Sequence, residues 1–251
     1  MRLSIIIPSC NNGKWVGKCL DSIINQTFQD FEIIVVDDLS TDDSVEIIKS
    51  KLRPQDTLII NESKRLNGGT RNVGILRAKG EYIFCIDCDD WLSHNKVLEN
   101  IDRKLNGEDI LFCGYITHQK DRDIFVNLKM RSLEQAFKDV ACAIWTKVVK
   151  ASLLKETLFK EGTLFEDRIN HYELLLKAKT FNNLDSEAIV WNRTNTNTIS
   201  GSMNSLWNTY RFNYIGDLYR LYPSLNDDLK AYVLREINGY MAQIREMVDK
   251  L

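Results

Sequence analysis

The stretch YIFCIDCDDW, residues 82–91, joins a run of apolar side chains to a cluster of carboxylates. A short apolar run of this kind predicts a buried strand. Asp87, Asp89 and Asp90 then follow at its carboxyl end. Two carboxylates separated by one residue offer the oxygen ligands that Mg²⁺ and Mn²⁺ prefer. Aspartates after strands are also common turn formers, so the triplet alone does not identify a site.

The chain before this stretch alternates between strand patterns and helix patterns. Short apolar runs predict the strands, and apolar side chains on one helical face predict the helices between them. The expected strands are residues 3–8, 31–36, 57–60 and 82–86, and the expected helices are residues 14–25, 45–51 and 68–79. Such alternation predicts right-handed βαβ units and a parallel sheet, in which ligands bind at the carboxyl ends of the strands.

The regular alternation ends after Asn106. Further strands are expected at residues 109–115, 124–126 and 188–191, and further helices at residues 132–139, 165–178, 206–221 and 225–251. The whole pattern predicts an α/β fold. Its Rossmann-like, mostly parallel sheet is flanked by helices and followed by a C-terminal helical extension.

The two last expected helices are rich in aromatic residues, and the final one carries a continuous apolar stripe. Leu229, Val233, Ile237 and Ile244 belong to this stripe, which this chain or another must cover. Packing against the rest of the chain, a homodimer or membrane-facing surface, and a platform for an acceptor all remain open.

The overall composition argues against several classes of protein. The chain has 251 residues, 44% of them hydrophobic, and a net charge of −2, so it can bury a core and is not disordered. A pI near 6.0 argues against broad, non-specific nucleic-acid binding. No segment approaches the roughly 20 apolar residues that span a bilayer, and the N-terminal run lacks signal-peptide features. We therefore expect a cytoplasmic protein, with peripheral attachment at the inner membrane face as an alternative.

The six cysteines do not form a recognisable metal or disulfide pattern. Cys85 and Cys88 make a CxxC, but no second CxxC or histidine pair accompanies it. We expect these cysteines to be buried thiols.

Three segments, in this order along the chain, resemble the family-2 glycosyltransferases of the GT-A fold. They are IIIPSCNN (residues 5–12), VVDDLSTDDS (residues 35–44) and GTRNVGILRAKGEYIFCIDCDDWL (residues 69–92). The resemblance implies an inverting enzyme that moves a sugar from a nucleotide-diphosphate sugar, first of all a UDP-sugar, to an acceptor hydroxyl. It also implies a divalent cation, Mn²⁺ or Mg²⁺.

With this resemblance, the chain divides into three expected parts. Residues 1–105 form the nucleotide-sugar-binding half, residues 106–204 the acceptor-binding half of the same domain, and residues 205–251 the helical extension. The acceptor implied is a glycan, a lipid-linked sugar or a polyol phosphate of surface polysaccharide synthesis.

The family motifs also imply roles for individual residues. The implied nucleotide-binding residues are Pro8, Ser9, Cys10, Asn11, Asp38, Arg71 and Asp87. A carboxylate at position 38 suits the N3–H of uracil, which it can accept as a hydrogen bond, although Asp38 could instead cap a turn or a helix start. Asp87 is expected to face the ribose or the metal, Asp89 to be the principal metal ligand, and Asp90 to cap the following turn. A bridging metal would neutralise the charge of the diphosphate leaving group.

Position 10 departs from the family pattern. The family commonly has a tyrosine that stacks on the base where this chain has Cys10. The cysteine lacks that stacking surface, which leaves the identity of the base open.

A second acidic motif, Glu166-Asp167, resembles the pair that supplies the general base in inverting enzymes of this family. The resemblance assigns the base to Asp167, the second member, with Glu166 as a further acceptor-side candidate. The base takes the proton of the acceptor hydroxyl as that hydroxyl attacks the anomeric carbon. Acids are also favoured at helix N-termini for purely electrostatic reasons.

Three more residues are candidates through the resemblance. Trp145 and Lys147 match an element that lines the acceptor side, where Trp145 either stacks on a sugar or belongs to the core. Arg193, with residues 198–201, matches a loop that closes over the donor phosphates.

Two other functions remain as alternatives. One keeps the chemistry but places the sugar on a nucleic-acid base or a protein. The other is a non-catalytic nucleotide-binding or scaffold protein on the same fold. A nicotinamide dehydrogenase is disfavoured, because no GxGxxG follows the first strand.

Overall fold

The computed structural model describes residues 1–138, 142–164, 166–195 and 207–248, and its centre is one continuous sheet. The strands are β1 (Leu3–Ser9), β2 (Phe31–Asp37), β3 (Thr57–Ile60), β4 (Tyr82–Cys85), β5 (Trp91–Leu92), β6 (Ile110–His118), β7 (Asp123–Val126), β8 (Lys147–Lys150) and β9 (Phe181–Asn192). Their order is β3-β2-β1-β4-β8-β6-β9-β5, and β7 pairs with β6.

The sheet is mixed but mostly parallel, as the sequence predicts. Of the nine strands that the structure describes, β1, β2, β3, β4, β6 and β9 run in one direction. Strands β5, β7 and β8 run in the other. The antiparallel β8 lies between β4 and β6, so the N-terminal parallel strands continue into the second half of the chain without a break.

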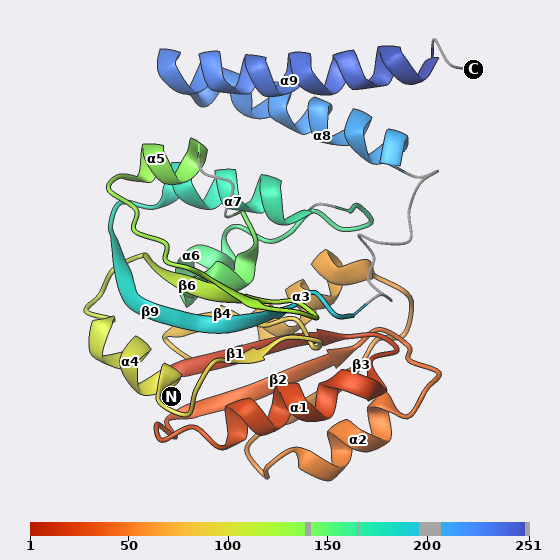
Figure 1. Cartoon of the computed structure of the whole chain (residues 1–251), viewed down its shortest axis with the longest axis vertical. Helices are drawn as coiled ribbons and strands as arrows, with labels where there is room; N and C mark the ends of the chain where they lie inside the picture. The colour runs from red at the N-terminus through yellow and green to blue at the C-terminus, as the bar shows by residue number, and fades with distance from the viewer. Residues whose placement is uncertain (139–141, 165, 196–206, 249–251) are drawn as a thin grey trace.

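Helices cover both faces of the sheet (Figure 1). They are α1 (Gly13–Ile24), α2 (Ser44–Lys51), α3 (Leu66–Arg77), α4 (Val97–Lys104), α5 (Leu133–Lys138), α6 (Ala151–Lys155), α7 (Glu166–Lys177), α8 (Trp207–Leu221) and α9 (Asp227–Val248). Two short 3₁₀ helices, η1 (Ile144–Thr146) and η3 (Tyr222–Ser224), complete the described elements.

The alternation of side chains along the strands creates two buried clusters. In β1, Ile5 and Ile7 pack with α1, α2 and α4 on one face, whereas Ile6 packs with α3, α6 and α7 on the other. Successive strand residues point to opposite faces, so a strand without polar positions must be covered on both sides. The N-terminal strands are covered in this way, and their polar residues are concentrated at the strand ends.

The C-terminal helices pack against this chain. Figure 1 shows α8 and α9 as an outer layer next to α5 and α7. The apolar stripe of α9, including Leu229, Val233, Ile237 and Ile244, is buried in the same cluster as Ile6 of β1. The helical extension therefore belongs to the core of the molecule, and its stripe is covered without a second copy. A homodimer stays a prediction.

The cysteines are free thiols, as the sequence predicts. Cys19, Cys85, Cys88 and Cys113 are buried, and Cys10 and Cys142 are half-buried. Burial raises the pKa of Cys85 and of Cys113 to about 12. Neither of these two side chains is therefore a thiolate at neutral pH.

Among the helices in the described part of the chain, none is long and apolar enough to cross a membrane.

Candidate active site

The carboxyl ends of β1, β2 and β3 meet at one edge of the sheet. The backbone N–H of Asp38 donates to the carbonyl of Ser9 at 2.8 Å, and that of Asn61 donates to the carbonyl of Asp37 at 2.9 Å. Pro8 and Ser9 end β1 opposite Val36 and Asp37 of β2. The predicted nucleotide-binding residues of the first two motifs therefore lie together, as the rule for parallel sheets requires.

Asp38 fixes the start of α3. Its Oδ1 accepts hydrogen bonds from Asn61 Nδ2 at 2.8 Å and from the N–H of Arg65 at 3.0 Å. Its Oδ2 accepts one from the N–H of Leu66 at 3.2 Å. This is the alternative that the sequence left open, a carboxylate at a helix start. A carboxylate has about four lone pairs, so these three bonds leave capacity for one further donor. A contact with the base stays a prediction.

Strained backbone surrounds the same edge. Asn11, Leu39 and Leu66 have φ values of 52°, 59° and 59°, in the left-handed region. Asparagine tolerates this conformation, but leucine pays roughly 1–2 kcal/mol for it. In the part of the chain that the structure describes, every non-glycine residue with positive φ thus lies beside the predicted nucleotide site. Such strain persists where the surrounding structure enforces it, commonly at binding sites.

Cys10 lies beside a lysine that the sequence did not single out. Lys64 Nζ is 3.0 Å from Cys10 Sγ and also donates to the carbonyl oxygens of Asp38 and Leu39. The ammonium group thereby joins the ends of β1 and β2 at the position where the family commonly has an aromatic ring.

Arg71 connects the two acidic motifs. Its side chain is buried, and Nη2 donates to Asp87 Oδ1 at 2.6 Å. Nη1 donates to Glu166 Oε1 at 2.8 Å and to Asp167 Oδ1 at 3.1 Å. Burial by itself would lower the pKa of Arg71, but the three carboxylates outweigh it and raise that pKa well above its usual value. The nucleotide contact implied for Arg71 stays a prediction. The observed contacts hold the end of β4 against the start of α7.

The two members of the acidic pair differ in their access to solvent. The Asp167 side chain is 22% exposed and that of Glu166 only 7%. Burial and the neighbouring Asp167 carboxylate raise the pKa of Glu166 to about 7. Burial also raises the pKa of Asp167, against the opposing effect of Arg71. A base must reach its substrate, so the greater exposure favours Asp167 over Glu166.

The turn after β4 is bound to the end of β9. Asp89 Oδ2 accepts a hydrogen bond from Asn195 Nδ2 at 2.8 Å, and Asp90 Oδ1 accepts one from the N–H of Asn192 at 2.8 Å. The prediction that Asp90 caps the following turn is therefore wrong. The carboxylate is buried and reaches 102 residues along the chain, which no local pattern could indicate.

The acidic turn suits a divalent cation. Burial and the neighbouring Asp87 carboxylate raise the pKa of Asp89 and of Asp90, which a nearby positive charge would offset. Asp90 Oδ2 is buried without a hydrogen-bond partner among the described residues. No three acidic, histidine or cysteine ligands converge on one point within the described ranges. Asp87 and Asp89 fit the one or two carboxylates that Mg²⁺ or Mn²⁺ takes when substrate phosphates and water complete its shell, and their role as metal ligands stays a prediction.

Of the three remaining candidates, Trp145 and Lys147 lie in the interior and Arg193 lies at the surface. Trp145 is 6% exposed and packs against Tyr115 and Trp191 with ring centroids 5.0 and 5.8 Å away, so it belongs to the core. Lys147 is buried and donates to the carbonyl of Ala143 at 2.8 Å. Burial lowers the pKa of Lys147 to about 8.

Arg193 is exposed, and its guanidinium lies 4.6 Å from the centre of the Trp191 ring. Residues 198–201, which the resemblance groups with Arg193, lie outside the described residues. The role of this segment in covering the donor phosphates stays a prediction.

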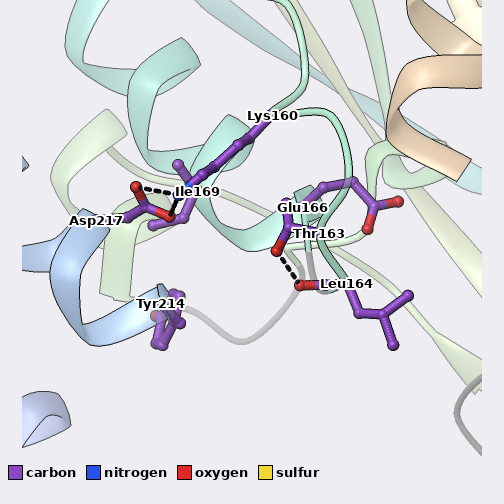
Figure 2. Close-up of a pocket in the computed structure, with 7 residues that line it drawn as sticks. All are labelled: Lys160, Thr163, Leu164, Glu166, Ile169, Tyr214 and Asp217. Carbon is purple, nitrogen blue, oxygen red and sulfur yellow. Dashed lines mark hydrogen bonds and ion pairs between the residues drawn. The ribbon is translucent and has the colours of Figure 1, made fainter. Parts of the chain in front are cut away.

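A small pocket lies behind the acidic pair, between the segment before α7 and helix α8 (Figure 2). Its volume is about 200 Å³, including space open to solvent, and its lining residues are Lys160, Thr163, Leu164, Glu166, Ile169, Tyr214 and Asp217. Lys160 Nζ donates to both carboxylate oxygens of Asp217 at 2.9 and 2.8 Å. Figure 2 shows the Glu166 carboxylate pointing away from this ion pair. The pocket therefore lies where α8 packs against α7 and the segment before it.

Three asparagines that no sequence motif indicated also contact the candidate site: Asn61, Asn192 and Asn195. Asn61 follows β3 directly, so the strand-end rule that selected Asp38 would also have selected it. Asn192 and Asn195 lie at and after the end of β9, outside every strand and helix predicted from the sequence. Their partners, Asp90 and Asp89, are known only from the fold.

Comparisons with known proteins bear on the family and the fold of this chain. The sequence profile of the family described as Glycosyl transferase family 2 matches residues 4–163. A poly(ribitol-phosphate) beta-glucosyltransferase of Bacillus spizizenii is 31% identical over 191 residues, which are 71% of this chain and 30% of that protein. Glycosyltransferase GlyG of Streptococcus pneumoniae is 28% identical over 198 residues, 70% of this chain and 65% of that protein. The chain thus spans about a third to two thirds of these relatives.

Solved structures share the fold. Residues 1–349 of TarS from S. aureus, in complex with UDP-GlcNAc, superpose with a TM-score of 0.78 and 22% identity, covering 96% of this chain and 72% of that one. Mannosyltransferase PcManGT from Pyrobaculum calidifontis, in complex with GDP-Man and Mn²⁺, gives a TM-score of 0.61 and 15% identity, with 94% and 69% covered. The GT-A fold expected from the sequence is confirmed.

Proposed function

Because this chain belongs to glycosyl transferase family 2, we propose that it transfers a sugar from a UDP-sugar to an acceptor hydroxyl with inversion at the anomeric carbon. One observation carries the proposal. Buried Arg71 holds Asp87, from the donor-side motif, and Glu166 and Asp167, from the acceptor-side motif, within 2.6 to 3.1 Å of a single guanidinium.

In the proposed reaction Asp167 is the general base. Its carboxylate takes the proton of the acceptor hydroxyl while the hydroxyl oxygen forms a bond to the anomeric carbon. The bond between that carbon and the diphosphate breaks, and the nucleoside diphosphate leaves with the electron pair. Attack from the face opposite the leaving group inverts the configuration, as in the inverting glycosidases.

Asp89 and Asp87 are the proposed metal ligands, with Mn²⁺ or Mg²⁺ as the cation. The cation would supply Lewis-acid stabilisation of the diphosphate leaving group. Asp87 also remains bound to Arg71, which sets the direction of its second carboxylate oxygen. The complex of PcManGT with Mn²⁺ supports the choice of cation.

The edge formed by Pro8, Ser9, Cys10, Asn11 and Asp38 is the proposed base pocket. Its position at the ends of β1 and β2 supports this assignment. Arg71 and Asp87 are further proposed nucleotide contacts. UDP is the proposed nucleotide, supported by the complex of TarS with UDP-GlcNAc. Residues 1–105 are accordingly the proposed donor half and residues 106–204 the proposed acceptor half.

The proposed acceptor is a polyol phosphate or a related surface polysaccharide. Several relatives are described as acting on poly(ribitol-phosphate), which supports a polyol acceptor for this chain. Such an acceptor suits a protein attached peripherally at the inner membrane face, and this location is part of the proposal.

The first experiment is a thermal-shift panel of UDP, GDP and their sugars, each with and without Mn²⁺ or Mg²⁺. Ligands that bind only the folded state raise the melting temperature with the logarithm of concentration over Kd. We expect a metal-dependent rise with the UDP compounds. No rise with any nucleotide would favour the scaffold alternative.

A second experiment tests the base. Asp167→Asn keeps the shape of the side chain but removes its basic oxygen, so we expect UDP release from UDP-GlcNAc or UDP-glucose to fall by about 10²-fold or more. Asp89→Ala should remove the metal dependence of the thermal shift. Full turnover in Asp167→Asn would contradict the base assignment.

A further inference from the structure

Arg168 follows Asp167 on α7 but contacts a different part of the molecule. Successive helix residues project about 100° apart, so neighbours can reach opposite surroundings. Asp167 contacts Arg71, on the sheet side. Arg168 Nη1 instead donates to Glu236 Oε2 at 3.1 Å and to the Tyr240 hydroxyl at 2.9 Å, both on α9.

The Arg168 guanidinium is the centre of a partly buried polar group. It lies 5.6 Å from the centre of the Tyr214 ring of α8, and the Tyr214 hydroxyl donates to Glu236 Oε2 at 3.3 Å. The side chains of Arg168 and Glu236 are only 26% and 24% exposed. An ion pair with two neutral hydrogen-bonding neighbours and little solvent is more rigid than an exposed pair.

Two further ion pairs hold the C-terminal helices to the same region. Lys160, in the segment before α7, pairs with Asp217 of α8 at 2.8 Å. Glu173, two turns along α7, pairs with Arg220 of α8 at 2.6 Å. Between them, apolar side chains of α8 and α9 pack on α7 in one buried cluster. Helices α8 and α9 thus contact α7 and its preceding segment at several points.

We propose that Arg168 is a positioning residue: through Glu236 and Tyr240 it fixes the first turn of α7, and with it the direction of the Asp167 carboxylate. The inference rests on the proposed function, in which Asp167 is the base. Arg71 holds the acids from the sheet side, and Arg168 holds the same turn from the side of α9. A displacement of about 1 Å at a catalytic group can lower a rate by about 10²-fold, so this second support affects turnover.

The test compares Glu236→Gln and Tyr240→Phe with a matched control. Glu236→Gln removes the negative charge of one partner of Arg168, Tyr240→Phe removes the hydroxyl of the other, and both leave the apolar contacts of α9 in place. Asp228→Asn is the control, because the ion pair of 2.8 Å that Asp228 makes with Lys138 joins α9 to α5 and not to α7. The measurements are kcat and KM for UDP release from UDP-GlcNAc or UDP-glucose, and the melting temperature.

We expect kcat to fall by about tenfold in Glu236→Gln and Tyr240→Phe, with KM for the donor unchanged. Asp228→Asn should keep the wild-type kcat. The double variant should lose less than the product of the two single effects, because both partners act through Arg168. A merely structural role would lower the melting temperature of all three variants alike without this split between kcat and KM.

Two outcomes overturn the inference in different ways. If Asp167→Asn loses turnover while Glu236→Gln and Tyr240→Phe keep the wild-type kcat, Arg168 does not position the base and the proposed function stands. If Asp167→Asn keeps full turnover, the base assignment is wrong and this inference falls with it.

Discussion

Arg71 binds three carboxylates through the two ends of one buried, planar guanidinium. Lysine would keep the positive charge but would present it as a point, without the fork that reaches several oxygens. We expect Arg71→Lys to fold with a reduced melting temperature and to lose about 10²-fold in kcat. Donor turnover and thermal unfolding check this, with the exposed Arg77→Lys of the same helix as control. Wild-type kcat in Arg71→Lys would show that the bridge is dispensable.

Glu166 makes stability depend on pH in a predictable direction. Burial and Asp167 raise its pKa to about 7 from an ordinary value of 4.5. The folded state therefore binds the proton more tightly than the unfolded state, and its stability falls as pH rises from about 4.5 through 7.

The neutral variant Glu166→Gln should not show this loss. We expect it to melt a few degrees above the wild type at pH 8 and at about the same temperature at pH 5. The exposed Glu62→Gln, which makes the same substitution at the surface, is the control. A Glu166→Gln variant less stable than the wild type at pH 8 would contradict the prediction.

At the scale of elements, α3 lies unusually close to the sheet at Gly74. A Cβ there would come within 2.6 Å of Ile6 Cγ2 and 3.3 Å of Val36 Cγ2. Gly74→Ala should therefore cost about 1–3 kcal/mol through overpacking. Gly239, in α9, has nothing within 4 Å of its Cβ position, so Gly239→Ala should stabilise by about 0.5–1 kcal/mol. Denaturant unfolding checks both, and equal shifts in the two variants would contradict the packing argument.

The sequence predicted the alternating elements up to β4 because each of them has a local pattern. It did not predict β8 (Lys147–Lys150), whose position between β4 and β6 depends on pairing with distant strands. No prediction covered α4 (Val97–Lys104) either, although its buried Val97, Leu98 and Ile101 follow a helical spacing.

The same limit applies to the candidate site. The strand-end rule brought Asp38 and Asp87 to one edge from sequence alone. The bridge from Arg71 to Glu166 and Asp167 spans 95 and 96 residues, and the bond from Asn192 to Asp90 spans 102. Contacts between residues so far apart in the sequence leave no periodic pattern or short motif. Only the fold could therefore reveal that Arg71 connects the two acidic motifs.

At the scale of the whole molecule, one buried cluster runs from β1 to α9. Ile6 of β1 and Ile237 of α9 both belong to it. We therefore expect a single cooperative unfolding transition, with the same midpoint by tryptophan fluorescence and by circular dichroism. Ile237→Ala should lower both midpoints together, at a cost of about 2–5 kcal/mol. Two separate transitions would mean that residues 207–248 fold as their own unit.

The packing of α8 and α9 on α7 also has a consequence for synthesis on the ribosome. Translation proceeds from the N-terminus, and every strand that forms the nucleotide edge is made before α8 begins at Trp207. A nascent chain can therefore form the edge that is proposed to bind the donor before α8 and α9 exist. At that stage α7, which carries Glu166 and Asp167, is not yet packed against them. If the chain has the proposed activity, we expect sugar transfer to require that α8 and α9 have packed on α7.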